Sequence, residues 1–210
     1  MRRIDKTKIL SSKYKEWLDK LDRDKVKHPP HSRTYYTDVV MNLLHCQKGV
    51  CAYTEMFLCN PGLLSEDKWE NGRYAKKKTE HFGELEHFDP KLKEKKFWEW
   101  DNLFVIHSDI NRLKRDKDVD DIPKPDSPGY DPDKLLEYDD DTHIFIPHTG
   151  IKNKTERQRI GRMIDVLQLN HDTVRCEREI FLKKVAEHRQ VNRTIDIDRF
   201  FTACRMALLE

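Results

Sequence analysis

Residues 84–117 constrain the fold more than any other stretch, because their apolar pattern changes period over a short distance. Residues 84–88 alternate between apolar and polar as a strand does, and residues 103–106 form a short apolar run typical of a buried strand. Residues 109–117 then carry helix-forming and basic side chains. The segment therefore predicts a strand, a loop, a second strand and a helix, in that order.

Apolar residues at helical spacing predict helices on both sides of this segment. They fall around residues 12–21, 36–48, 160–167, 170–189 and 197–208, with further short strands at 50–53 and 144–146 and a long acidic loop at 118–141. The expected fold class is α+β, mostly helical with an embedded strand–strand–helix core. We expect three regions, 1–48, 49–117 and 118–210, that fold together as one compact unit.

The charge of the chain is nearly balanced overall but uneven along its length. The net charge is +2, yet residues 1–33 hold 11 Lys and Arg against 5 acids, and residues 118–141 hold 10 acids against 2 Lys. Such segregation can build a basic face that attracts a polyanion, although an ordinary solvated surface has the same composition. Apolar residues make up 37% of the chain, which is enough for a folded core.

The chain has five Cys, begins without a secretory apolar region, and contains no apolar run long enough to cross a bilayer. An odd number of Cys in such a chain indicates reduced thiols. We therefore expect a cytoplasmic protein without a membrane partner.

The residue types that phosphodiester hydrolysis requires occur together in this segment. A neutral His can take a proton from water, and carboxylate or amide oxygens can hold a hard divalent cation that neutralises the leaving oxygen. They stand in three stretches: Glu86-His87, Trp100-Asp101-Asn102, and Asn111-Arg112-Leu113-Lys114. Each stretch alone is more often a surface pair, a turn or a solvated helix, so the order of the three carries the hypothesis.

The same stretches resemble the core of the HNH (ββα-metal) endonucleases, and more narrowly the HNH nucleases encoded with Septu-type anti-phage systems and some retrons. Residues 83–91 carry the first part of the resemblance. Residues 51–55 stand where that group has a Cys-x-Tyr-Cys-Glu element, and Leu167–His171 with Arg175 resemble a downstream segment. The resemblance covers about residues 46–178.

The resemblance implies roles for individual residues. His87 would be the general base, Asn102 would orient it, and Glu86 and Asn111 would hold Mg²⁺ or Mn²⁺. Lys91, Arg112 and Lys114 would contact phosphates, with Lys114 the favoured contact. Glu80-His81 repeats the Glu-His pair, and we prefer His87 because Asn102 follows it at the expected distance in the sequence.

A structural zinc site is incomplete by the same comparison. Zinc-bearing relatives have two Cys-x-x-Cys pairs, whereas Thr54 and Ile110 stand here at two of the four ligand positions. Cys51 and His107 remain, with Cys46 or Cys59 as the alternative completion. Because structural zinc takes four ligands, we expect no complete zinc site.

Three functional hypotheses follow. The first is a metal-dependent HNH endonuclease acting on nucleic acid, DNA in preference to RNA, in bacterial anti-phage defence with a possible partner ATPase subunit. The second is a non-catalytic nucleic-acid-binding or scaffold subunit with the same fold. The third is a helical module that binds a partner protein. The chain has no Gly-rich phosphate-binding loop, so it is not itself expected to hydrolyse nucleotides.

Overall fold

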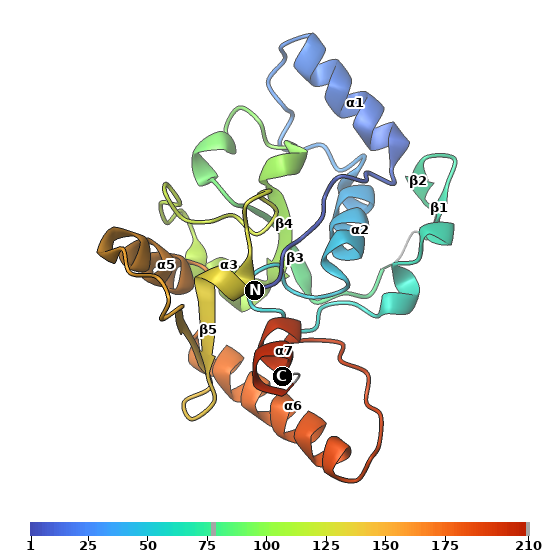
Figure 1. Cartoon of the computed structure of the whole chain (residues 1–210). Helices are drawn as coiled ribbons and strands as arrows, with labels where there is room; N and C mark the ends of the chain where they lie inside the picture. Colours follow the sequence, from blue (N-terminus) through green and yellow to red (C-terminus); the bar gives the residue numbers. More distant parts are fainter. Residues whose placement is uncertain (77–78, 209–210) are drawn as a thin grey trace. The chain divides into compact units, whose positions relative to one another are not determined.

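A computed structural model describes residues 1–76 and 79–208 (Figure 1). It is mixed α and β, as expected, but α-helical and 3-10 helical residues together make up 42% of it rather than a majority. The helices are α1 Ser12–Arg23, α2 Tyr36–Gln47, α3 Ser108–Lys114, α4 Pro132–Leu135, α5 Lys154–Val166, α6 Asp172–Gln190 and α7 Phe201–Leu208. The strands are β1 Trp69–Glu70, β2 Arg73–Tyr74, β3 Gly83–His87, β4 Leu103–His107, β5 Leu136–Asp139 and β6 Ile144–Pro147, and they pair as three antiparallel hairpins.

The chain divides into two compact units. Unit 1 comprises residues 1–3, 50–57 and 119–210, and unit 2 comprises residues 4–49 and 58–118. The expected boundary after residue 117 lies one residue from the observed one. In contrast, the N-terminal helical region and the strand–strand–helix segment share unit 2 instead of forming separate regions.

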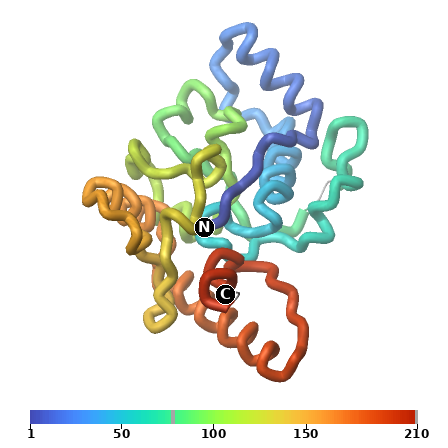
Figure 2. The backbone as a smooth tube through the Cα atoms, in the orientation of Figure 1, coloured from blue at the N-terminus to red at the C-terminus, as the bar shows by residue number. Residues whose placement is uncertain are grey.

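Unit 2 contains the expected strand–strand–helix order. β3 pairs antiparallel with β4, with His87 opposite Leu103 and Gly83 opposite His107, and α3 follows β4 directly. The prediction for residues 84–117 is confirmed at this level, although α3 ends at Lys114 rather than near residue 117. The connection between the strands, residues 88–102, runs out from the hairpin and returns (green in Figure 2).

Helix α2 packs against β4, and its last residue, Gln47, is hydrogen-bonded to that strand. Gln47 is buried, its amide donates to the carbonyl of Val105 at 2.7 Å, and its oxygen accepts from the Val105 amide at 2.9 Å. These two bonds satisfy the outer edge of β4 as a neighbouring strand would. Lys48 and Gly49 then take positive φ angles of 57° and 79°, which ends α2 as predicted.

Unit 1 is built around the β5–β6 hairpin, α5, α6 and α7. Arg178 of α6 is fully buried, and its guanidinium donates to the carbonyls of Leu169 and His143 at 3.0 and 2.6 Å. The segment 50–57 joins this unit, where Glu55 accepts hydrogen bonds from the amide and hydroxyl of Thr202 at 2.8 and 2.6 Å.

One expectation about a loop was wrong. The acidic segment 118–141 contains β5, in which Leu136 and Tyr138 alternate with acidic residues that conceal the strand pattern. Residues 60–80 contain the β1–β2 hairpin, whose turn residues Asn71 and Gly72 have φ angles of 50° and 76°. An Asn-Gly turn of this kind is a strong hairpin signal. Within the described part of the chain, none of the helices has the length and apolar character to cross a membrane.

Candidate active site

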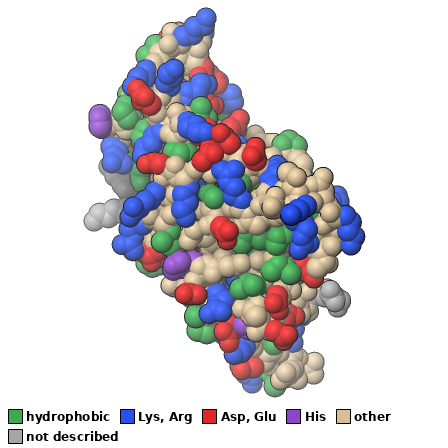
Figure 3. All heavy atoms as spheres, turned by 90° about the vertical axis from the view of Figure 1, so that its left-hand side faces the viewer, with side chains coloured by type: hydrophobic (Ala, Val, Ile, Leu, Met, Phe, Trp, Pro, Cys, Tyr) green, Lys and Arg blue, Asp and Glu red, His purple; other side chains and the backbone are tan. Residues whose placement is uncertain are grey.

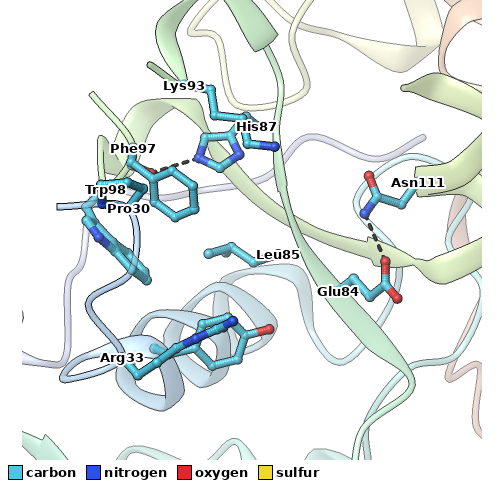
Figure 4. Close-up of a pocket in the computed structure, with 10 residues that line it drawn as sticks. Pro30, Arg33, Glu84, Leu85, His87, Lys93, Phe97, Trp98 and Asn111 are labelled. Carbon is cyan, nitrogen blue, oxygen red and sulfur yellow. Dashed lines mark hydrogen bonds between the residues drawn. The ribbon is translucent and has the colours of Figure 1, made fainter. Parts of the chain in front are cut away.

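A cleft of about 340 Å³ lies along the edge of β3 in unit 2. Three residues of this strand line it, together with Asn111 of α3, Tyr36 of α2 and residues from two connecting segments. Leu85 and His87 lie on one side of the strand and Glu84 with Asn111 on the other (Figure 4). The remaining lining residues are Pro30, Arg33, Tyr36, Lys93, Phe97 and Trp98.

His87, the last residue of β3, is held in one tautomer. Its Nε2 lies 2.8 Å from the carbonyl oxygen of Phe97, and the two rings pack edge to face with centroids 4.6 Å apart (Figure 4). A carbonyl can only accept, so Nε2 carries the proton and Nδ1 keeps its lone pair. The imidazole is therefore fixed in orientation with one nitrogen able to accept a proton.

Burial lowers the pKa of His87 to about 4. The side chain is 8% exposed, and desolvation disfavours its charged form. The hydrogen bond to Phe97 acts in the opposite direction, while the positive charges of Lys93 and Lys114 lower the pKa further. At neutral pH the imidazole is uncharged, which is the form that a general base requires.

Asn102 does not fill the role expected of it by direct contact. Its Oδ1 accepts from the Asp89 amide at 2.8 Å, and its Nδ2 donates to the Asp89 carbonyl at 2.9 Å. Phe97, not Asn102, supplies the group that orients His87. Asn102 instead closes the loop 88–102 at its base, and that loop carries Phe97.

Glu86 and Lys114 form a buried ion pair away from solvent. The Lys114 ammonium lies 2.6 Å from the Glu86 carboxylate and also donates to the carbonyl of Phe88 at 2.8 Å. Lys114 is fully buried and Glu86 is 4% exposed. This burial contradicts the assignment of Lys114 to a phosphate contact, and it engages the carboxylate that was expected to hold a metal ion. The reason is alternation along β3, which turns Glu86 towards α3 and His87 to the opposite face.

Glu84 and Asn111 form the exposed counterpart of that pair. Glu84 shares a face of β3 with Glu86 but lies two residues earlier in the strand, and its carboxylate accepts from the Asn111 amide at 2.9 Å (Figure 4). A rotation of the Asn111 amide would present its oxygen beside the carboxylate. Mg²⁺ binds one or two such oxygens and completes its shell with water and phosphate, so this pair fits a divalent cation.

Arg33, Tyr36 and Lys93 are lining residues that the sequence pattern did not reveal. The Arg33 guanidinium lies over the Tyr36 ring, 5.0 Å from its centroid, and faces the cleft below Leu85 (Figure 4). Arg33 is more than 50 positions from His87 in the sequence, so spacing could not connect them. A cluster of basic and aromatic residues after Pro29-Pro30 was the signal available.

Lys91 and Arg112 are exposed, and each pairs with an acid. Lys91 lies 2.8 Å from Asp118, and Arg112 pairs with Asp109 one helical turn away. On the face shown in Figure 3, Lys and Arg side chains lie among Asp and Glu side chains. The attraction of this surface for phosphate therefore depends on those Lys and Arg side chains that have no carboxylate beside them.

The remaining candidates have structural surroundings. Cys51 is a fully buried free thiol in unit 1, and His107 in unit 2 caps α3 by accepting from the Asp109 amide at 3.3 Å. His81, the alternative base, forms an isolated bridge with Cys59, and burial lowers its pKa. Across residues 1–76 and 79–208, three or more His, Cys, Asp or Glu side chains do not gather into a metal-binding group.

Comparison with known proteins gives no assignment. The chain matches no known family. It also has no significant match among curated proteins.

Proposed function

We propose that this protein is a metal-dependent HNH endonuclease that hydrolyses phosphodiester bonds of nucleic acid, with DNA as the favoured substrate. The observation that carries the proposal is the setting of His87, a neutral imidazole held by the Phe97 carbonyl at the end of a strand–strand–helix segment. The resemblance to anti-phage HNH nucleases supports the same reaction and adds a partner ATPase in the cytoplasm.

In this proposal each group in the cleft has one task. His87 Nδ1 takes a proton from the attacking water. Glu84 and Asn111 would hold a divalent cation, which supplies charge neutralisation at the leaving oxygen. Arg33 and Lys93 bring positive charge to the same cleft, where it attracts the phosphate.

The test is cleavage of supercoiled plasmid with Mg²⁺, Mn²⁺ or EDTA, with and without the partner ATPase. His87→Ala should lower the cleavage rate roughly 10²–10⁴-fold, because general-base loss typically has this effect. His81→Ala is the matched control and should cut at the wild-type rate. Loss of cleavage in His81→Ala with full activity in His87→Ala would identify the other Glu-His pair as the base.

A second pair of variants decides which of the two carboxylates, Glu84 or Glu86, binds the metal ion. Glu84→Gln removes a carboxylate that faces the cleft, so it should weaken Mn²⁺ binding and slow cleavage. Glu86→Gln removes a carboxylate paired with Lys114, so its main effect should be on stability. The opposite result would restore Glu86 as the ligand and exclude Glu84.

A non-catalytic nucleic-acid-binding subunit is the second candidate. The buried Glu86–Lys114 pair favours it, because it leaves the cleft with one fewer carboxylate than the family pattern implies. Mn²⁺ binding measured by electron paramagnetic resonance separates the two. Nucleic-acid binding without Mn²⁺ binding or cleavage would support the second candidate.

A further inference from the structure

A second hollow in unit 2 borders the His87 cleft. It is a groove of about 680 Å³ between the end of α1 with the residues that follow it and residues 94–96 of the loop between β3 and β4. Its charged lining consists of Lys25, Lys27, Lys95 and Lys96, with Asp22 and Glu94. The groove is therefore predominantly basic.

The groove and the cleft share two chain segments. Residues 25–28 line the groove, and Pro30 and Arg33 line the cleft directly after them. Lys93 lines the cleft, residues 94–96 line the groove, and Phe97 and Trp98 return to the cleft. The two hollows are thus consecutive along one pair of segments.

Hydrogen bonds hold these segments side by side. The His28 amide donates to the Lys95 carbonyl at 3.0 Å, and the Trp98 amide donates to His28 Nδ1 at 3.0 Å. In Figure 1 the segment after α1 accordingly runs beside the loop that follows β3. His28 and Trp98 are buried, so the junction between groove and cleft is a fixed part of unit 2.

The cations of this surface are only partly neutralised. Lys27 lies 3.5 Å from Glu94, and Lys96 lies 2.7 Å from Glu99 and 3.4 Å from Asp22. Lys25 and Lys95 have no carboxylate within ion-pair distance among the residues that the structure describes, and the same is true of Arg33 and Lys93 in the cleft. Unneutralised cations that follow a groove are the electrostatic footprint of a polyanion site.

We propose that this groove binds the phosphodiester backbone of a nucleic acid and leads it into the His87 cleft, with Lys25 and Lys95 as phosphate contacts. The inference rests on the proposed function and adds the path of the substrate to it. Contacts of this kind are independent of base sequence, and they give affinity that falls with salt. If Lys25 and Lys95 are only solvated, their removal should change neither the affinity for nucleic acid nor its dependence on salt.

The experiment measures duplex DNA binding as a function of salt in a His87→Ala background, in which the DNA stays intact. The groove variant is Lys25→Gln with Lys95→Gln, because Gln removes the charge and keeps an unbranched polar side chain. The control is Lys152→Gln with Lys154→Gln, which removes the same charge from exposed positions of unit 1. Thermal melting of each variant verifies folding.

The groove variant should bind unrelated duplexes more weakly and by similar factors. Loss of two phosphate contacts should flatten the plot of log K against log salt by about 1.8, because each contact contributes about 0.9 for duplex DNA. The control should keep the slope of the His87→Ala parent. An unchanged slope in the groove variant, or equal loss in the control, would overturn the proposal.

The binding result is independent of catalysis. Suppose that the wild-type protein does not cut DNA with either cation, but that removal of Lys25 and Lys95 flattens the plot of log K against log salt. The groove is then supported and the proposed nuclease function is excluded. If the wild-type protein cuts DNA, and Lys25→Gln with Lys95→Gln made without the His87 change binds and cuts like wild type, the nuclease is supported and the groove is excluded. Lys25→Glu with Lys95→Glu should deepen the binding defect if the contacts are electrostatic.

Discussion

His87 is kept neutral by its surroundings, and this has a consequence for stability as well as for chemistry. The folded protein binds a proton at His87 only below about pH 4, whereas an unfolded His has a pKa near 6.5. Between these values the unfolded state binds more protons than the folded state. Stability therefore rises with pH through this window and is lost as the pH falls.

The first prediction is a pH-dependent stability that disappears with the imidazole. From pH 7 to pH 4 the contribution of His87 to the free energy of unfolding should fall by roughly 3 kcal/mol, from 1.36 kcal/mol per pKa unit. Urea denaturation at several pH values measures this loss in wild type and in His87→Gln. Their difference isolates His87 from His28 and His81, whose pKa values burial also lowers. Parallel curves would show that His87 does not titrate with a lowered pKa.

The Glu86–Lys114 pair gives a second prediction at the same scale. Lys114→Met leaves the Glu86 carboxylate buried without its cation, and breaking such a pair typically costs about 3–5 kcal/mol. The double variant Glu86→Met with Lys114→Met should be less destabilised, because no unpaired charge remains. Arg112→Met is the control on the exposed side of α3, where an effect within about 0.5 kcal/mol is expected.

Urea denaturation of the four proteins decides between a structural and a phosphate-binding Lys114. Wild-type stability in Lys114→Met, together with a flatter salt dependence of DNA binding, would return Lys114 to the nucleic-acid interface. The sequence could place Lys114 on a helix near Glu86 but could not show which side of that helix faces the core. Burial of both residues depends on how α3 packs against β3, which is a tertiary property.

At the scale of elements, the loop between β3 and β4 determines the geometry of the cleft. Asp89 and Asn102 join the two ends of this loop by paired hydrogen bonds, and the loop supplies the Phe97 carbonyl to His87. The order of strand, loop, strand and helix could be predicted from apolar runs in the sequence. The path of the loop could not be predicted, because it depends on hydrogen bonds to backbone groups. Every residue has such groups, so the sequence does not show which of them are used.

The third prediction concerns this loop. Asn102→Ala leaves the Asp89 amide and carbonyl without their partners, which should cost about 1–3 kcal/mol, since Asn102 is 5% exposed. The cleavage rate should fall while DNA affinity changes little, because the Phe97 carbonyl loses its fixed position. Chemical denaturation and single-turnover kinetics measure the two effects. A variant with wild-type stability and wild-type rate would show that the Asp89 bonds do not order the loop.

Element boundaries were predictable where side-chain period was the main signal. Helices α2 and α6 begin and end within a few residues of the positions expected from the sequence. β5 was missed because Glu137 and Asp139 make its segment look like an acidic loop, although Leu136 is buried. A strand with one solvated face tolerates such residues, so composition alone misidentifies it.

At the scale of the whole molecule, the division into units does not follow chain order. Residues 50–57 interrupt unit 2 in sequence and belong to unit 1. Glu55, within this short segment, accepts from both the amide and the hydroxyl of Thr202 at the start of α7, and its carboxylate is buried. A sequence reading by contiguous ranges could not anticipate this, because the partners are 147 positions apart.

The last prediction uses Glu55 to test whether the two units are separate in stability. Glu55→Ala removes the acceptor for two buried donors of Thr202, so unit 1 should be destabilised by several times the roughly 1 kcal/mol of an ordinary hydrogen bond. Hydrogen–deuterium exchange should accelerate in α7 and in the β5–β6 hairpin, because local opening reflects the stability of the unit that opens. β3 and β4 should keep their protection, since their bonds lie within unit 2. Thr202→Val, which removes the hydroxyl and keeps the amide, should give a smaller effect confined to the same elements. Equal acceleration in β3 and β4 would contradict this prediction, because it would mean that the two units unfold together. Cleavage by the Glu55→Ala protein would then be lost, because the cleft in unit 2 would open along with unit 1.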